Sequence, residues 1–221
     1  MTAAVSHEIR NPLNAASLQL SLLERGLDAL EVPERAPLMT TLGLVRAELT
    51  RLGHIVEDFV LMANPRPGRR RWLDVGALTH HVFDALVKVA EQNSVRVERR
   101  VGESQMAMVD EGQIRQVLMN VGLNAIEAAP ANGVIAVTVA VSDVHLTITI
   151  DDSGPGVSAA IRERIFEPFF TTKALGPGLG LSIVRGIVAQ HDGEVSVAES
   201  PLGGARFTVT LPATERGEVA R

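Results

Sequence analysis

The segment that decides the fold reads NVGLNAIEA and spans residues 120–128. It is largely apolar, and Asn120 and Asn124 stand four residues apart, so they share one face of a helix. Asparagine is locally unfavourable inside a helix because its side chain competes for backbone hydrogen bonds. Two of them therefore indicate either a ligand site or polar groups that are satisfied within the core.

The helix around this segment has a clear start and end. Asp110 opens it, with Gln113 three residues later in a capping-box pattern, and Pro130 stops it. Amide oxygens on such a helix suit Mg²⁺, which is held by few protein groups together with phosphates and water.

Strand patterns surround the helix and predict a mixed sheet. Residues 134–141 and 145–150 are alternating β-branched runs around Ser142-Asp143, which predicts a hairpin. Further short strands are expected at 95–97, 106–109, 194–199 and 205–211, and a helix at 75–92. With helices on one face, the sheet forms an α+β two-layer sandwich.

Two glycine-rich stretches interrupt this pattern. The first, DDSGPG at residues 151–156, follows a strand and precedes an expected helix, and it also has the composition of an ordinary turn. The second, GPGLGLSI at 176–183, opens a helix, where backbone amides hold phosphate well. It is not a Walker loop, and a flexible connection is the alternative. Residues 171–175 before it are expected to form a mobile lid, in which Lys173 can neutralise phosphate charge.

The first 60 residues predict two helices. Apolar residues recur every three or four positions over 2–30, and again from Leu38 to Phe59 with coiled-coil spacing, on either side of a proline-containing loop. One hairpin buries little surface, so we expect two to pair into a dimeric four-helix bundle. The alternative is a monomeric hairpin packed on the next domain. The predicted domains are a helical hairpin at 1–64, a linker at 65–72, a sandwich at 73–212 and a tail at 213–221.

The segment SHEIRNPLN at residues 6–14 carries a candidate nucleophile. His7 lies off the apolar stripe and should face solvent, and a neutral imidazole nitrogen can accept a phosphoryl group. Glu8 can take the proton or hold the other ring nitrogen, and Asn11 lies one turn further on the same face. The alternative is an exposed histidine that happens to stand beside a glutamate.

Composition excludes several classes of function. The chain has no cysteine, which rules out disulfides and thiolate chemistry, and its formal charge of −5 does not suggest nucleic-acid binding. No stretch reaches the roughly 20 apolar residues of a membrane span, and no signal peptide is visible. We expect a cytoplasmic fragment without membrane contact, whose sensor and any anchor lie outside the sequence, because His7 follows Met1 so closely.

Together these motifs resemble the histidine kinase family in order and spacing, over about residues 2–212. The stretch 6–14 resembles its H box, 120–124 its N box, 152–156 and 176–180 its two glycine boxes, and IFEPFF at 165–170 its F box. The resemblance implies a dimerisation and phosphotransfer domain followed by an ATP-binding domain of the Bergerat fold.

The resemblance also implies roles for individual residues. His7 is phosphorylated by Mg²⁺-ATP and passes the phosphoryl group to an aspartate of a response regulator receiver domain, which Glu8 and Asn11 also help to dephosphorylate. Asn124 is the Mg²⁺ ligand, and Asp152 accepts a hydrogen bond from the adenine amino group. Phe169-Phe170 docks the ATP domain near the bundle, or simply packs. The other implied ATP-binding residues are Asn120, Gly154, Gly156, Lys173, Gly176, Gly178, Leu179 and Gly180.

Four rival functions remain. A gyrase-like ATPase uses a glutamate to activate water where this chain has Asn120, a serine kinase of the same fold lacks the histidine segment, and a non-catalytic scaffold predicts damaged motifs. The fourth keeps the same fold but has a dominant phosphatase activity. One departure from the family is Pro177, where threonine is frequent.

Overall fold

The computed structural model describes residues 15–27, 35–63, 68–102, 104–173 and 178–213. The chain divides into two compact units, Met1–Pro65 and Arg66–Arg221.

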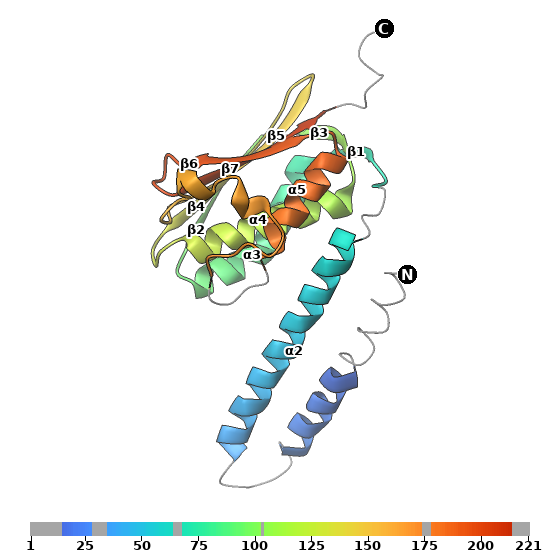
Figure 1. The fold of residues 1–221 in the computed structure, drawn as a ribbon, viewed down its shortest axis with the longest axis vertical. Coiled ribbons are helices and arrows are strands. Elements are labelled where there is room, and N and C mark those ends of the chain that lie inside the picture. Colours follow the sequence, from blue (N-terminus) through green and yellow to red (C-terminus); the bar gives the residue numbers. More distant parts are fainter. Residues whose placement is uncertain (1–14, 28–34, 64–67, 103, 174–177, 214–221) are drawn as a thin grey trace. The chain divides into compact units, whose positions relative to one another are not determined.

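The first unit is a pair of antiparallel helices, formed by residues 15–27 and by α2 (Arg35–Ala63) (Figure 1). Arg46 of α2 joins them, because its guanidinium donates to Ser21 Oγ at 3.2 Å and pairs with Glu24. The predicted hairpin is thus present. Its apolar seam is only partly covered within this pair, since Leu23 and Leu52 are 58% and 40% exposed.

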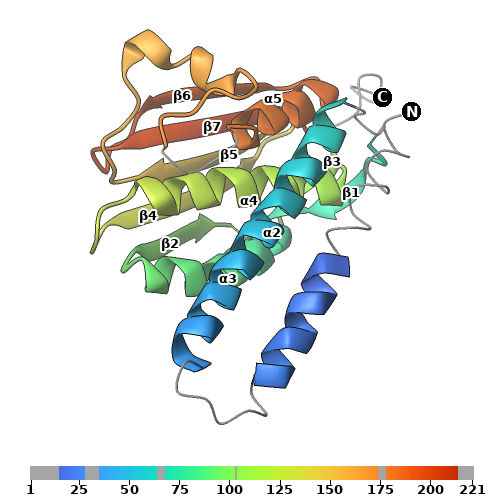
Figure 2. The ribbon, with the colours of Figure 1, turned by 60° about the horizontal axis from the view of Figure 1, so that its bottom comes forward.

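The second unit is a five-stranded sheet with helices on one face (Figure 2). The strand order is β2-β4-β5-β7-β6; β2 and β4 are parallel and the other pairs antiparallel, so the predicted mixed sheet is confirmed. The strands are β2 (Arg96–Val101), β4 (Val134–Val141), β5 (His145–Asp152), β6 (Glu194–Glu199) and β7 (Ala205–Pro212). The helices are α3 (Val75–Gln92), α4 (Glu111–Ala128) and α5 (Gly180–Gln190).

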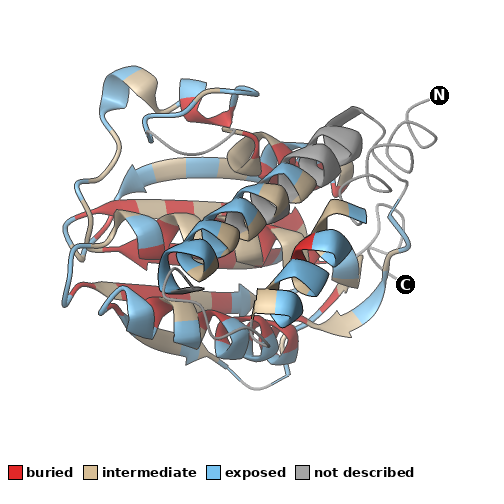
Figure 3. Cartoon of the chain, turned by 90° about the horizontal axis from the view of Figure 1, so that it is seen from below, coloured by how far each residue is buried: buried red, intermediate tan, exposed pale blue. Residues whose placement is uncertain are grey.

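Apolar residues form the core where the helices meet the sheet (Figure 3). Aliphatic side chains dominate it, and Phe83 is its largest fully buried side chain. Alternation along β7 and β5 turns every second residue inward, as in Val209 and Ile148. Helix α4 packs against both α3 and α5 and against β5, so it lies at the centre of the helical layer.

Two local features differ from the sequence prediction. Residues 71–74, of which Arg71 and Trp72 fall in the expected linker, form strand β1, which pairs antiparallel with β3 (Met106–Val109) as a separate two-stranded sheet. The expected helix after Gly156 is replaced by two short 3₁₀ segments, Ala159–Ile161 and Arg164–Phe166. Strand β1 depends on its pairing with β3, a tertiary contact that a local pattern does not contain.

The start of α4 is capped as predicted, since Asp110 Oδ1 accepts a hydrogen bond from Gln113 N at 2.9 Å. The Asp110 N–H in turn donates to His191 Nε2 at 3.2 Å, just beyond the end of α5. His191 is buried, and its Nδ1 lies 2.9 Å from the Ile187 carbonyl oxygen. A neutral ring that donates from Nδ1 and accepts at Nε2 satisfies both contacts.

Burial lowers the pKa of His191 below its ordinary value, with Arg70 acting in the same direction and the Ile187 carbonyl, Asp110 and Asp192 opposing it. A histidine with a lowered folded pKa binds fewer protons than in the unfolded chain. We therefore predict that the melting temperature falls as the pH drops below about 6.5, the unfolded value. His191→Gln should flatten this dependence, whereas the exposed His80→Gln should retain it; identical profiles for the two variants would contradict the assignment.

Candidate nucleotide site

Asp152 closes strand β5 and is almost fully buried. Its Oδ1 accepts hydrogen bonds from Gly154 N at 2.8 Å and Ala205 N at 3.1 Å. Burial raises the pKa of this carboxyl, against the lowering effect of those two N–H groups. The hydrogen bonds that the described residues make to the Asp152 carboxyl group go to Oδ1, so Oδ2 is the oxygen that can accept from a ligand.

Close backbone approach holds this carboxylate in place. A Cβ on Gly204 would lie 2.0 Å from Asp152 Oδ1, and one on Gly154 would lie 2.5 Å from the carbonyl oxygen of Ala128, at the end of α4. Gly156 has a φ of +73°, which glycine adopts without a steric penalty. Gly154 and Gly156 are predicted from the sequence, whereas Gly204 and Ala205 are not. The only sequence signal for these two is the Gly203-Gly204 pair before the last strand.

The neighbouring Asp151 has a different environment. Both of its oxygens accept from Arg206, each at 2.8 Å, in a bidentate pair that neutralises the carboxylate within the sheet. Of the two adjacent aspartates, Asp152 is therefore the one whose carboxylate faces a site without a paired guanidinium.

The two asparagines of α4 contact two other parts of the site. Asn120 Nδ2 donates to the carbonyl oxygen of Gly180 at 3.1 Å, at the start of α5. One turn later, Asn124 Oδ1 accepts from Lys173 Nζ at 2.8 Å, and the same ammonium pairs with Glu127. The structure thus brings together Asn120, Asn124, Lys173 and Gly180, which the sequence analysis grouped as one site.

The described part of the second glycine stretch begins at Gly178, whose backbone lies against the F box segment. Gly178 has a φ of +67°, and a Cβ there would lie 2.6 Å from the Phe170 carbonyl oxygen. Phe169 N donates to the Gly178 carbonyl at 3.0 Å. The buried Leu179 then leads into α5, which begins at Gly180, and its carbonyl oxygen accepts from Ser182 Oγ at 2.8 Å. The backbone amides at this helix start are arranged to receive an anion.

The two phenylalanines of the F box segment differ from each other. The guanidinium of Arg164 lies 4.8 Å from the centre of the Phe170 ring, a cation–π contact that helps to hold this ring, and a docking role for Phe170 stays a prediction. Phe169 is 60% exposed and has a φ of +66°, a strained conformation for a residue with a side chain. Its role in docking remains a prediction.

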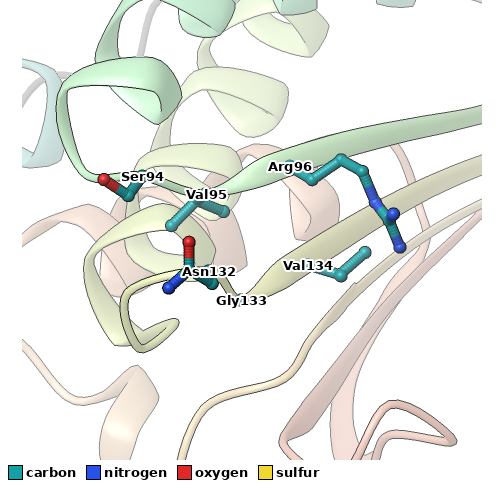
Figure 4. A pocket seen from close by; sticks show the side chains of 6 residues that line it. All are labelled: Ser94, Val95, Arg96, Asn132, Gly133 and Val134. Atoms are coloured by element: carbon teal, nitrogen blue, oxygen red, sulfur yellow. The ribbon is translucent and has the colours of Figure 1, made fainter.

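A separate hollow lies beside the starts of β2 and β4 (Figure 4). The backbone N–H of Asn132 donates to the Ser94 carbonyl and that of Arg96 to the Gly133 carbonyl, which ties the two turns together. Arg96 also pairs with Glu98 at 3.2 Å. None of the predicted site residues lines this hollow. Its backbone polar groups form the hydrogen bonds that join the two turns. Its lining consists of Ser94, Val95, Arg96, Asn132, Gly133 and Val134.

Four predicted site residues lie outside the described part of the chain: His7, Glu8, Asn11 and Gly176. Within the described ranges, no group of three or more His, Asp or Glu side chains could hold a metal ion. The helices described there also include none with the length and apolarity needed to cross a membrane.

Comparison with known proteins gives the family. Residues 1–68 match the His Kinase A (phospho-acceptor) domain, and residues 109–215 match the family described as histidine kinase-, DNA gyrase B- and HSP90-like ATPase. The chain belongs to the histidine kinase family. It is 35% identical to the sensor histidine kinase ZraS of Escherichia coli O157:H7 over 96% of its length, and 29% identical to sporulation kinase C of Bacillus subtilis, also over 96%. It spans about half the length of these relatives, 45% and 48%.

Solved histidine kinase structures share the fold. Full-length ShkA, in complex with AMPPNP, superposes with a TM-score of 0.82 at 30% identity, over 96% of this chain and 46% of that one. The catalytic domain of the histidine kinase ThkA matches with a TM-score of 0.62 at 30% identity, over 66% of this chain and 97% of that one. A helical region followed by an α/β sandwich is therefore the architecture of this kinase core.

Asp152 supplies a first test of the site. In Asp152→Asn the amide oxygen can still accept from Gly154 and Ala205, but the new NH₂ group would oppose the adenine amino group that the sequence predicts as the partner of Asp152. We predict that nucleotide affinity falls at least about 10-fold, the cost of leaving one buried polar pair unmade, while the melting temperature does not fall. Titration calorimetry with ADP and thermal unfolding would measure both, and unchanged ADP affinity would remove Asp152 from the site.

A substitution at Gly204 tests the close approach of its backbone to Asp152. A methyl group in Gly204→Ala collides with Asp152 Oδ1, so we predict a destabilisation of about 1–3 kcal/mol and weaker ADP binding. Gly186→Ala is the matched control, because its Cβ meets nothing within 4 Å on an exposed position of α5; it should be neutral or stabilise by up to about 1 kcal/mol. Urea unfolding that gives equal stabilities for the two variants would contradict the close approach.

Proposed function

We propose that this chain is the catalytic core of a sensor histidine kinase, which uses Mg²⁺-ATP to phosphorylate His7 and then passes the phosphoryl group to an aspartate of a response regulator. The observation that carries the proposal is the convergence on one face of α4, where Asn120 contacts the Gly180 carbonyl and Asn124 contacts Lys173. Family membership and the buried Asp152 support an ATP site in the same unit.

Each part of the site would hold a different part of ATP. Asp152 Oδ2 would accept a hydrogen bond from the adenine amino group, with Gly154 and Gly156 allowing the base to approach the backbone. Gly176, Gly178, Leu179 and Gly180 would present backbone amides to the phosphates, and the Lys173 ammonium would neutralise phosphate charge. Full-length ShkA, which shares the fold, is described in complex with AMPPNP.

Asn124 suits the Mg²⁺ that accompanies ATP. Its Oδ1 accepts a hydrogen bond from the Lys173 ammonium, and this contact with a cation supports Asn124 as a ligand of positive charge. Mg²⁺ would supply charge neutralisation at the phosphate oxygens. Asn120, which is tied to Gly180, would keep α4 and the glycine turn in register beside the phosphates.

The phosphotransfer unit would act through His7, Glu8 and Asn11. An imidazole nitrogen of His7 would attack the γ-phosphate, and Glu8 would take or hold the proton on the other side of the ring. Asn11, one turn further, would orient water toward a phosphorylated regulator, which gives the core a regulator phosphatase activity as well.

The partners would be a second copy of the chain and a receiver domain. Residues of both helices in the first unit, among them Leu23, Val45 and Leu52, remain exposed, and these apolar side chains support pairing into a four-helix bundle. ThkA, 28% identical over 99% of this chain and 62% of its own, is described in complex with its response regulator TrrA. Because ATP is the phosphoryl donor, this core would act in the cytoplasm.

Each segment of the chain would have a different function. Residues 1–64 would carry dimerisation and phosphotransfer, 65–72 would link the units, 73–212 would bind ATP and 213–221 would form a tail. A water-activating ATPase fits less well, because the amide of Asn120 donates to Gly180 and cannot act as a base.

Incubation with γ-labelled ATP and Mg²⁺ tests the proposal. Wild type should acquire acid-labile label, His7→Gln should lose all label while still binding ADP, and Asn124→Ala should be labelled about 100-fold more slowly because transition-state charge is less well stabilised. Acid-stable label would indicate a serine kinase, and ADP binding without label on wild type would contradict autophosphorylation by this chain.

A further inference from the structure

The Lys173 ammonium lies against two oxygen atoms of α4. Its Nζ donates to Asn124 Oδ1 at 2.8 Å and forms an ion pair with Glu127 Oε2. Asn124 and Glu127 are three residues apart, so they share the face of α4 that also carries Asn120. One amide oxygen and one carboxylate oxygen therefore converge on a single cationic atom.

This pair of oxygens has the chemistry of a divalent-cation site. Mg²⁺ binds carboxylate and carbonyl oxygens, usually through one or two protein groups, and takes its remaining ligands from phosphates and water. The contacts of Lys173 Nζ support this site, because the position of the ammonium is one at which both oxygens reach the same cation. Of these two residues, only Asn124 is predicted from the sequence as a metal ligand, and Glu127 has no role in the nucleotide site described above.

We propose that Glu127 is a second protein ligand of the divalent cation that accompanies ATP, and that Lys173 competes with this cation for the Asn124 and Glu127 oxygens. The inference rests on the proposed function, since it concerns the cation at Asn124. Binding of the metal displaces the ammonium, which is then available to the phosphates.

Exposure makes this exchange feasible. The side chains of Lys173 and Glu127 are 39% and 53% exposed, so their ion pair is screened by water and only weakly held. A divalent ion carries twice the charge of the ammonium and gains more from the Glu127 carboxylate. The ammonium therefore competes for the two oxygens but can be displaced by the metal ion.

Mn²⁺ is the probe for the Glu127 part of the proposal. Free Mn²⁺ is followed by electron paramagnetic resonance in the full chain with saturating ADP, for wild type, Glu127→Gln and Glu91→Gln. The control removes the same charge from an exposed position of α3. We expect Glu127→Gln to bind Mn²⁺ about 10-fold more weakly, within the range for loss of a metal-supporting group, and Glu91→Gln to match wild type; equal affinities for the two variants would overturn Glu127 as a ligand.

Lys173→Met tests the competition, with Mn²⁺ alone followed by water proton relaxation. Loss of a competing exposed ion pair should tighten Mn²⁺ binding about 2- to 5-fold, and the gain should shrink when Glu127→Gln is also present. Unchanged or weaker Mn²⁺ binding by Lys173→Met would overturn the competition and leave the contact as an ordinary surface ion pair.

Asn124→Ala separates the two levels of the account. If Asn124→Ala loses Mn²⁺ binding with ADP while Glu127→Gln matches its control, only the role of Glu127 fails. If neither variant changes Mn²⁺ binding although ADP binds, the cation site at Asn124 in the proposed function fails as well.

Discussion

The buried Asp152 carboxylate is the constraint on which the rest of the site depends. A carboxylate at the end of a central strand can stay buried only if hydrogen bonds satisfy it, and the backbone N–H groups of Gly154 and Ala205 supply them. Ala205 can reach Oδ1 only because Gly204 has no side chain in the way. The turn after β5 and the turn before β7 are thereby fixed against each other, and the second oxygen is left to face a ligand.

Helix α4 connects Asp152 to Lys173 and to the start of α5. Its last turn packs against the Gly154 turn, where the Ala128 carbonyl leaves no room for a Cβ. Further back along the helix, Asn124 and Asn120 contact Lys173 and the start of α5. Helix α4 also packs between α3 and α5, and these contacts hold its polar face in position. Asparagine has a low helix propensity, so the two mid-helix asparagines are explained by the contacts that their side chains make.

Local patterns were sufficient to predict the elements whose signals lie within a few residues. The capped start of α4, its end before Pro130 and the β4–β5 hairpin are confirmed. Gly204, Ala205 and Arg206 could not be predicted as partners of Asp152 and Asp151, because they lie more than 50 residues away and only the β5–β7 pairing brings them close. Strand β1 likewise depends on a tertiary contact, its pairing with β3, while the role of the His7 segment stays a prediction from the sequence.

The central claim is that ATP lies along the polar face of α4. It is tested most directly by nuclear magnetic resonance of the asparagine side-chain amides during titration with a non-hydrolysable ATP analogue and Mg²⁺. The account predicts that the signals of Asn120 and Asn124 shift in saturable fashion, whereas that of Asn93, which caps the end of α3, does not. Saturable binding of the analogue with the Asn120 and Asn124 signals unmoved would contradict it.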